Sequence, residues 1–189
     1  MSDIVGILLA AGAAKRFGAD KLMHPLADGT PIALASARHL LRVLPNSVAV
    51  VRSAHGELAP GLRAEGLIVA ECAEAAEGMG RTLAAGVRAA PHAAGWVVAL
   101  ADMPFVRPAS IDKVAQALRD GAAIAATAFR GERGHPVGFA ARYFDELGAL
   151  RGDQGARDIL KRDARAIVLC ETDDPGVLRD IDTPADLVP

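Results

Sequence analysis

The stretch from Ile4 to Lys21 constrains the fold of this chain more than any other part of it. Its first half, Ile4 to Leu9, is an apolar run of the kind that forms a buried strand in a parallel sheet. The strand opens into a loop of small residues that also carries Lys15, Arg16 and Lys21. Small residues let a ligand approach the backbone, and backbone N–H groups beside cations suit a polyphosphate. We therefore predict a phosphate-binding loop at the carboxyl end of this strand, where open α/β sheets bind ligands. An ordinary connection with solvated cations is the alternative.

Two common phosphate-binding motifs do not fit this loop. A dinucleotide-binding loop requires Gly-x-Gly-x-x-Gly, which Gly12 and Gly18 do not supply. A P-loop requires Gly-x-x-x-x-Gly-Lys-Ser/Thr, but Gly18 follows Phe17 and precedes Ala19. The cations of the loop therefore belong to a different design of phosphate site.

Further apolar runs alternate with helical patterns along the rest of the chain. Strands are expected at Val48–Val51, Leu67–Ala70, Trp96–Leu100, Ala122–Phe129 and Ile167–Cys170. The alternation predicts a three-layer α/β/α, Rossmann-like fold with a mostly parallel sheet. After a turn at Arg130–Gly134, the segment His135–Phe139 is expected to return antiparallel as a small hairpin. The length of 189 residues, without a linker or a long repeat, favours one domain over residues 1–189.

The first helix is predicted from apolar residues that recur at helical spacing. They are Leu34, Ala37, Leu41 and Leu44. This stripe is expected to face the core and to leave Ser36 on the outer side of the helix.

Composition excludes several classes of partner. The formal net charge is −2, from 21 basic and 23 acidic residues, so there is no case for a general nucleic-acid or membrane surface. Aromatic residues are 4% of the chain, too few for platforms on which bases stack. Cys72 and Cys170 have no partner spacing, and we expect thiols in a reducing compartment rather than a metal site or a disulfide.

The apolar run near the start of the chain does not have the features of a secretory signal. The residues before it are Met-Ser-Asp, without a basic segment, and the basic residues follow it. No stretch approaches the roughly 18 apolar residues that a membrane span needs. A cytoplasmic protein without a membrane segment is expected.

Asp102 is a second candidate site residue. It follows the apolar run that ends at Ala101, so it is expected at the same edge of the sheet as Gly12, and Pro104 helps to fix its turn. Mg²⁺ prefers one or two carboxylates together with phosphate oxygens of the substrate. A metal ligand and a carboxylate that only shapes the turn are equally open from the residues alone.

The loop and Asp102 together resemble the MobA-like nucleotidyltransferases. The family signature Leu-Ala-Ala/Gly-Gly-x-Ser-x-Arg-x-Gly-x-x-Lys is matched at its fixed positions, except that Ala14 stands at the serine. The resemblance is greatest to molybdenum cofactor cytidylyltransferases. It implies a fold of the nucleotide-diphospho-sugar transferase type. The matching positions that it implies for nucleotide binding and for catalysis are Leu9, Ala10, Ala11, Gly12, Arg16 and Lys21.

The resemblance also implies a magnesium centre. Ala101-Asp102-Met103-Pro104 is similar to the family motif whose aspartate ligates the metal. Asp182, in Asp-Ile-Asp-Thr-Pro-x-Asp-Leu, resembles the closing motif of the family. Asp182 is either a second metal ligand or the cap of a final turn that Thr183 and Pro184 open.

Three further segments resemble binding motifs of the family. The run with Gly80 and Thr82 is similar to a segment beside the nucleobase, although Thr82 also suits a helix cap. His135, in Gly-His-Pro, corresponds to a residue that faces the acceptor, or makes a structural hydrogen bond. The segment 153–157 matches an acceptor-side motif of the cytidylyltransferase branch.

The implied reaction is Mg²⁺-dependent transfer of CMP from CTP to the terminal phosphate of a molybdopterin-type cofactor, with release of pyrophosphate. A molybdoenzyme would receive the product. CTP is favoured because Leu-Ala-Ala-Gly replaces the Leu-Ala-Gly-Gly of the guanylyl branch, and the methyl of Ala11 would narrow a base pocket. The alternatives are a guanylyltransferase, an NTP transferase with another phosphorylated acceptor, and a non-catalytic maturation factor for molybdoenzymes.

Overall fold

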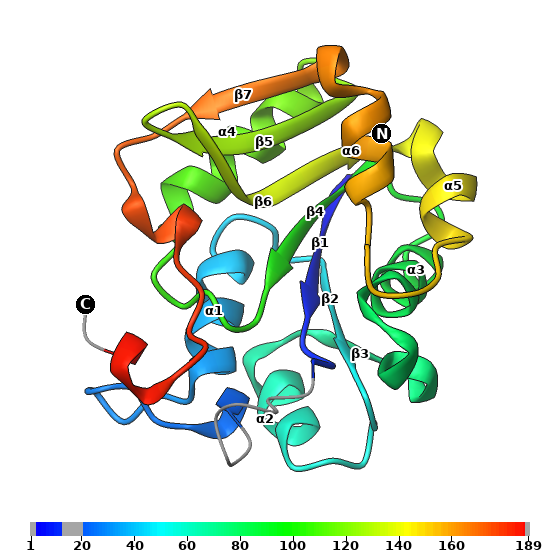
Figure 1. Cartoon of the computed structure of the whole chain (residues 1–189). Helices are drawn as coiled ribbons and strands as arrows, with labels where there is room; N and C mark the ends of the chain where they lie inside the picture. Colours follow the sequence, from blue (N-terminus) through cyan, green and yellow to red (C-terminus); the bar gives the residue numbers. More distant parts are fainter. Residues whose placement is uncertain (1–2, 13–20, 188–189) are drawn as a thin grey trace.

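A mixed β-sheet lies at the centre of the molecule (Figure 1). The computed structural model describes residues 3–12 and 21–187, and within them the sheet has seven strands in the order β3-β2-β1-β4-β6-β5-β7. The strands are β1 (Ile4–Leu9), β2 (Ser47–Val51), β3 (Ile68–Glu71), β4 (Gly95–Leu100), β5 (Ile124–Phe129), β6 (Glu132–Ala140) and β7 (Ile167–Glu171). The β1, β2, β3 and β4 strands are parallel, as the sequence pattern predicts.

The central strands are apolar on both faces because both faces are covered. Ile7 packs into one hydrophobic core, whereas the next residue, Leu8, packs into the other. Val97 and Val98 of β4 divide between the same two cores. A strand that alternates between two cores reads as a continuous apolar run, which is the pattern seen in the sequence.

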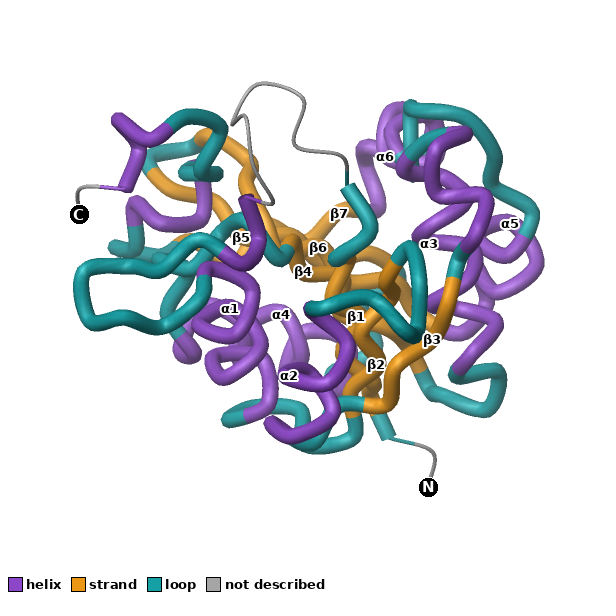
Figure 2. Tube along the Cα trace, turned by 90° about the horizontal axis from the view of Figure 1, so that it is seen from below, coloured by secondary structure: helices purple, strands orange, loops and turns teal. Residues whose placement is uncertain are grey.

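Helices form the outer two layers. The α-helices are α1 (Ile32–Leu41), α2 (Leu58–Glu65), α3 (Met79–Ala89), α4 (Pro108–Arg119), α5 (Phe144–Gly148) and α6 (Arg157–Arg162). The 3₁₀ segments are η1 (Lys21–Met23), η2 (Ala73–Glu77), η3 (Ala141–Tyr143), η4 (Ala164–Ala166), η5 (Pro175–Leu178) and η6 (Pro184–Leu187). Helices α1, α2 and α4 cover one face, and α3, α5 and α6 cover the other (Figure 2). The predicted three-layer α/β/α fold is confirmed.

The predicted hairpin is present, but its turn is shorter than expected. The turn consists of Arg130 and Gly131, with φ of 53° and 80°, and Glu132 already pairs with Phe129. Two consecutive residues with positive φ are typical of a type I′ turn, whose twist matches that of the flanking strands. Strand β6 therefore begins at Glu132, and it runs between β4 and β5, antiparallel to both. This placement brings His135 into the main sheet.

The predicted buried stripe of α1 is wrong in one informative respect. Ser36, expected on the outer side, is buried, and its hydroxyl donates to the carbonyl of Ala101 at 2.9 Å. Leu34 and Leu41 of the expected stripe are only partly buried. The small polar side chain can approach the end of β4 closely, and it holds the residue that precedes Asp102.

No helix in the described ranges is long and apolar enough to cross a membrane.

Candidate active site

The carboxyl ends of β2, β1 and β4 meet at one rim of the sheet. The N–H of Ala10 donates to the carbonyl of Val50 at 2.8 Å, and the N–H of Ala101 donates to Leu9 at 3.1 Å. Beyond these last ladder bonds, the chain leaves the sheet at Arg52 after β2, at Ala11 after β1 and at Asp102 after β4. Parallel pairing therefore brings to one place residues that are far apart in the sequence.

Lys21 and two carboxylates form a charged cluster at this rim. The Lys21 Nζ lies 2.8 Å from Oδ2 of Asp102 and 3.5 Å from Oδ1 of Asp182. The Lys21 side chain is 11% exposed, against 25% for Asp102 and 44% for Asp182. Burial by itself lowers the pKa of Lys21, but the hydrogen bond to Asp102 and the charges of both carboxylates outweigh it and raise the pKa. Lys21 is therefore a permanent cation near neutral pH.

Asp180 joins Asp102 and Asp182 in a group of possible metal ligands. One carboxylate oxygen of each lies within 4.8 Å of the others. Carboxylate oxygens are the hard ligands that Mg²⁺ and Mn²⁺ prefer, so this donor set fits a divalent cation. We did not predict Asp180 from the sequence. The alternation in Asp-Ile-Asp could have revealed it, because an extended segment places residues two apart on the same side.

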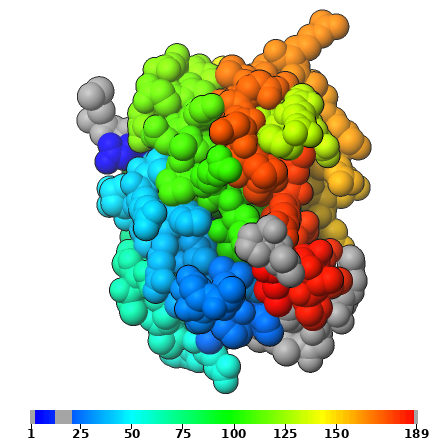
Figure 3. Space-filling view, turned by 90° about the vertical axis from the view of Figure 1, so that its left-hand side faces the viewer, coloured from blue at the N-terminus to red at the C-terminus, as the bar shows by residue number. Residues whose placement is uncertain are grey.

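The buried Ile181 positions the two C-terminal aspartates. Its side chain is 0% exposed, and its N–H donates to the carbonyl of Asp102 at 2.9 Å. This contact joins the C-terminal segment to the end of β4, and the neighbouring carboxylates stay at the surface. In the space-filling view, the C-terminal segment lies beside the segment that begins at Lys21 (Figure 3).

Asp186, in the first turn of η6, bonds back to the two residues that precede this turn. Its Oδ2 accepts hydrogen bonds from the N–H groups of Asp182 and Thr183 and from the Thr183 hydroxyl, at 2.7 to 3.1 Å. The hydrogen bonds from Thr183 hold the pKa of Asp186 below its ordinary value. Oδ1 of Asp182 lies 3.5 Å from Lys21 Nζ, and its role as a metal ligand stays a prediction.

A cavity of about 600 Å³ lies along the rim. This rim cavity is lined by five predicted site residues: Leu9, Ala11, Gly12, Thr82 and Asp102. Ala10, between Leu9 and Ala11, is buried and does not line it, and its N–H belongs to the sheet ladder. Arg16, the other predicted catalytic cation, lies outside the described residues.

One residue of the rim cavity, Arg52, was not predicted from the sequence, and another, Asp153, was predicted elsewhere. Arg52 follows β2, and its Nη2 donates to the carbonyl of Ala11 at 3.4 Å. A basic residue directly after a buried strand, next to the phosphate-loop strand, is a signal that could have found it. Asp153 enters the cavity from the loop before α6, and it was expected only on the acceptor side.

Thr82 and Gly80 differ in what they contribute. Helix α3 begins at Met79, so Thr82 lies inside the helix. The alternative prediction, that Thr82 caps this helix, is wrong. Its side chain is buried at the wall of the rim cavity. At Gly80, whose predicted role in nucleotide binding stays a prediction, a Cβ would fall 2.7 Å from the carbonyl oxygen of Arg151. Gly80 therefore allows α3 to pack against the segment 151–152.

A second cavity, of about 480 Å³, lies beside the first. This β6 cavity has cationic and polar side chains, which are Arg133, His135, Gln154 and Arg157, over an apolar floor that includes Val137 and Phe139. The predicted acceptor segment 153–157 thus lines the same cavity as His135. The two cavities share part of their lining, namely Leu9, Met79, Leu100 and Asp153.

The imidazole of His135 is neutral near neutral pH. Burial lowers its pKa, the charge of Arg133 lowers it further, and the charge of Asp102 opposes both effects. Its buried Nδ1 has no hydrogen-bond partner among the described residues. A neutral imidazole at the wall of the β6 cavity can accept or donate a hydrogen bond to a ligand.

The arrangement suits the handling of phosphates. Among the described residues, two cations, Lys21 and Arg52, and a group of carboxylates stand beside a cavity large enough for a nucleotide. Two guanidinium groups stand in the adjoining cavity, and guanidinium is well matched to phosphate. The shared wall means that groups bound in the two cavities would meet near Leu9, Leu100 and Asp153.

Comparison with known proteins gives a consistent picture. The MobA-like NTP transferase domain matches residues 6–167. The chain is 31% identical to the purine catabolism protein PucB of Bacillus subtilis, over 96% of this chain and 92% of that one.

Solved structures also match over nearly the whole chain. Rv0371c of Mycobacterium tuberculosis is 26% identical with a TM-score of 0.80, over 98% of this chain and 95% of that one. The same protein in complex with manganese is 25% identical with a TM-score of 0.73, over 98% of this chain and 96% of that one. A nucleotidyl transferase from Methanothermobacter has a TM-score of 0.83 and shares the fold. It is 23% identical, over 97% of this chain and 94% of that one.

Proposed function

The chain belongs to the MobA-like NTP transferase family, and from this we propose that it transfers CMP from CTP to the terminal phosphate of a molybdopterin-type cofactor. The reaction releases pyrophosphate and depends on Mg²⁺. The whole chain of 189 residues acts as one transferase domain. Nucleotidyl transfer follows from the family, whereas the nucleotide, the metal and the acceptor are the proposed parts.

One observation carries the proposal: two cavities that adjoin beside a cation and carboxylates. The rim cavity, with Asp102 and Thr82, would hold the nucleoside triphosphate. The β6 cavity, with Arg133 and Arg157, would hold a phosphorylated acceptor. Because the cavities share Asp153 and the apolar side chains next to it, the acceptor phosphate and the α-phosphate can be brought into contact. Such positioning is a large part of what catalysis requires.

The acceptor phosphate needs no strong general base. Its second pKa is about 6, so near neutral pH it is already a dianion. The Arg133 and Arg157 guanidinium groups would orient it toward the α-phosphorus, while the apolar floor of the cavity excludes water. His135, being neutral, would donate or accept one hydrogen bond to the acceptor rather than transfer a proton.

Charge compensation on the nucleotide side would come from Lys21. Its ammonium would neutralise charge on the triphosphate and on the departing pyrophosphate. Asp102, Asp180 and Asp182 would hold Mg²⁺, which supplies further compensation of charge on phosphate oxygens. Arg16, outside the described residues, would act with Lys21.

The proposal that the nucleotide is CTP depends on the position of Ala11 in the rim cavity. Ala11 is 3% exposed and lines the rim cavity, so its methyl reduces the space for a base. A pyrimidine occupies less space than a purine, which favours CTP over GTP. The name of the relative from Bacillus subtilis refers to purine catabolism, and a recipient molybdoenzyme of the present chain would act in such a pathway.

Incubation with single nucleotides, Mg²⁺ and phosphorylated acceptors tests the proposal. We expect a dinucleotide adduct by mass spectrometry only with a molybdopterin-type acceptor, and most rapidly with CTP. An adduct that forms only with GTP would show that the nucleotide is GTP rather than CTP. An adduct with a sugar phosphate would show that the acceptor is not a molybdopterin-type cofactor. Tight binding of the cofactor without pyrophosphate release from any nucleotide would indicate a maturation factor.

A further inference from the structure

The carboxylates that could bind a metal already have a cation between them. The ammonium of Lys21 lies 2.8 Å from Asp102 Oδ2 and 3.5 Å from Asp182 Oδ1. Both carboxylates belong to the group whose oxygens, together with one of Asp180, lie within 4.8 Å of one another. The Lys21 side chain thus neutralises charge at the place where a divalent ion would do so.

A divalent ion and this ammonium cannot both be held well by the same oxygens. A cation ligated by Asp102 would share that carboxylate with a lysine only 11% exposed. A divalent ion and an ammonium bound to the same carboxylate would lie close together, and two positive charges repel more strongly where little water screens them. Without any counter-ion, however, the three carboxylates would repel one another in the same way. The ammonium therefore offsets part of this repulsion, and a divalent ion that ligates Asp102 has to compete with it for the same oxygens.

We propose that Lys21 is the resident counter-ion of the metal centre, and that a divalent cation binds tightly only when a triphosphate draws the ammonium away from Asp102. This inference rests on the proposed function for the identity of the displacing ligand. The exchange needs only rotation of the lysine side chain, which has a flexible four-carbon stem.

The exchange makes nucleotide and metal bind cooperatively. The triphosphate offers oxygens to the ammonium and, at the same time, oxygens that complete the ligand set of the metal. Linkage then requires each ligand to raise the affinity of the other by the same factor. The resting protein, in turn, is protected from the repulsion among its own carboxylates.

Binding of Mn²⁺ alone tests the inference, with the free ion followed by electron paramagnetic resonance. Lys21→Met removes the competing charge and keeps most of the side-chain volume. We expect this variant to bind Mn²⁺, without nucleotide, at least about tenfold more tightly than the wild type, which is within the usual range of such couplings. The factor by which CTP tightens Mn²⁺ binding should fall correspondingly.

Two further variants separate charge from structure. Lys21→Arg keeps the positive charge and should leave Mn²⁺ binding as weak as in the wild type. Lys113→Met removes a lysine of α4 that donates to the carbonyl of Glu171, and it should also leave binding unchanged. If Lys21→Met does not give a folded protein by circular dichroism, Lys21→Gln replaces it as the decisive variant.

Equal or weaker Mn²⁺ binding by the decisive variant would overturn the inference, as would tight binding by Lys21→Arg. The measurement is independent of product formation. A protein that forms no adduct in the nucleotide assay can still show tighter Mn²⁺ binding in the variant. Failure of the proposed function and failure of this inference are therefore distinguishable.

Discussion

The two halves of the sheet hold their charges in different ways. In the parallel half, β3-β2-β1-β4, the pair Lys21–Asp102 is mostly buried at the rim, where its ion pair costs desolvation. In the half formed by β6, β5 and β7, the corresponding cluster is exposed: the Arg162 side chain is 57% exposed and pairs with Glu146 and Asp163.

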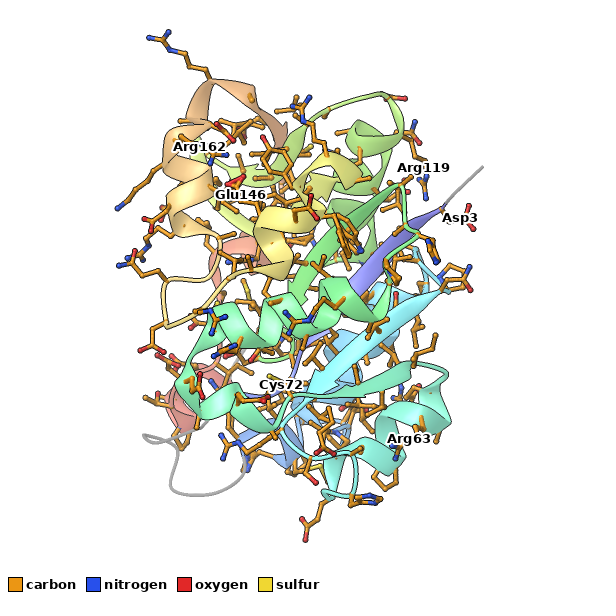
Figure 4. The ribbon with its side chains drawn as sticks, turned by 90° about the vertical axis from the view of Figure 1, so that its right-hand side faces the viewer. Asp3, Arg63, Cys72, Arg119, Glu146 and Arg162 are labelled. Atoms are coloured by element: carbon orange, nitrogen blue, oxygen red, sulfur yellow. The ribbon has the colours of Figure 1, made fainter. Side chains whose placement is uncertain are left out.

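The difference indicates what each cluster does. The exposed cluster joins α5 to α6, and Figure 4 shows Arg162 and Glu146 directed toward one another between these helices. It braces the segment that lines the β6 cavity, and water can replace its contacts at little cost. The buried pair Lys21–Asp102 is not explained by a role in stabilising the fold, because its desolvation offsets much of the attraction. Buried charges at a cavity are typical of functional sites. Substitutions in the two halves should therefore have different consequences.

The largest expected effect is that of Asp102→Asn on the rate of pyrophosphate release. Loss of the carboxylate removes a metal ligand, and with it several kcal/mol of charge stabilisation, roughly a thousandfold in rate. Initial rates at saturating CTP and Mg²⁺ measure it. Asp112→Asn, an exposed carboxylate of α4, serves as the control. A normal rate of pyrophosphate release by Asp102→Asn at an ordinary Mg²⁺ concentration would show that Asp102 is not a ligand of the catalytic metal.

Lys21→Met should come next, with a loss of roughly 3–4 kcal/mol of transition-state stabilisation, by analogy with one preorganised donor. The effect should fall on kcat, because the charge that Lys21 neutralises develops on the leaving pyrophosphate. Steady-state kinetics with varied CTP measure it, with Lys113→Met as the matched control. A change in the KM for CTP alone would mean that Lys21 only binds the nucleotide.

Arg157→Gln tests the other half of the sheet. A charge-assisted hydrogen bond to the acceptor phosphate contributes about 1.5–3 kcal/mol, so the KM for the acceptor should rise about 10- to 100-fold. The KM for CTP should stay the same, because Arg157 lines only the β6 cavity of the two. Arg119→Gln, on α4, is the control. An equal rise in both constants would contradict the division into two cavities.

A smaller effect is expected at Ala11. CTP should protect the wild type against thermal unfolding more than GTP does at the same concentration, as linkage requires of the tighter ligand. Ala11→Gly should shift the ratio of kcat/KM for the two nucleotides toward GTP by about tenfold, the value of one methyl group in a pocket. An unchanged ratio would show that another residue selects the base.

The smallest effect should come from Asp163→Asn in the exposed cluster. The hydrogen bonds from Arg162, and then from Tyr143, lower the pKa of Asp163 from its ordinary value of 3.8 to about 2. A depressed carboxylate pKa stabilises the folded state above pH 3.8, and this contribution is lost as the pH falls toward 2. The variant should have a slightly lower Tm at pH 7, and the difference should vanish across that window. A difference that persists at pH 2 would contradict the ionic explanation.

Sequence patterns predicted the parallel half better than the other half. Ile4–Leu9 and Trp96–Leu100 read as buried strands, and parallel pairing alone then places Gly12 and Asp102 at one rim. In the other half the hairpin was expected, but not its insertion between β4 and β5, since pairing between strands leaves no local signal.

The missed residues have a common cause. Asp180, Arg52 and Arg133 reach the site through contacts between segments distant in the sequence. Ser36 was misplaced because helical spacing assigns polar residues to the outer side. Its burial depends on a carbonyl of β4 that the sequence of α1 cannot reveal.

Transfer of an oxygen label tests the central claim most directly, namely that a phosphate held in the β6 cavity attacks the α-phosphorus of a nucleotide in the rim cavity. The acceptor is prepared with ¹⁸O at every non-bridging oxygen of its phosphate, and the products are analysed by mass spectrometry. Our account predicts that all of the label stays in the dinucleotide adduct and that the pyrophosphate carries none. Label in the pyrophosphate, or loss of label from the adduct, would show that the acceptor phosphate is not the attacking group.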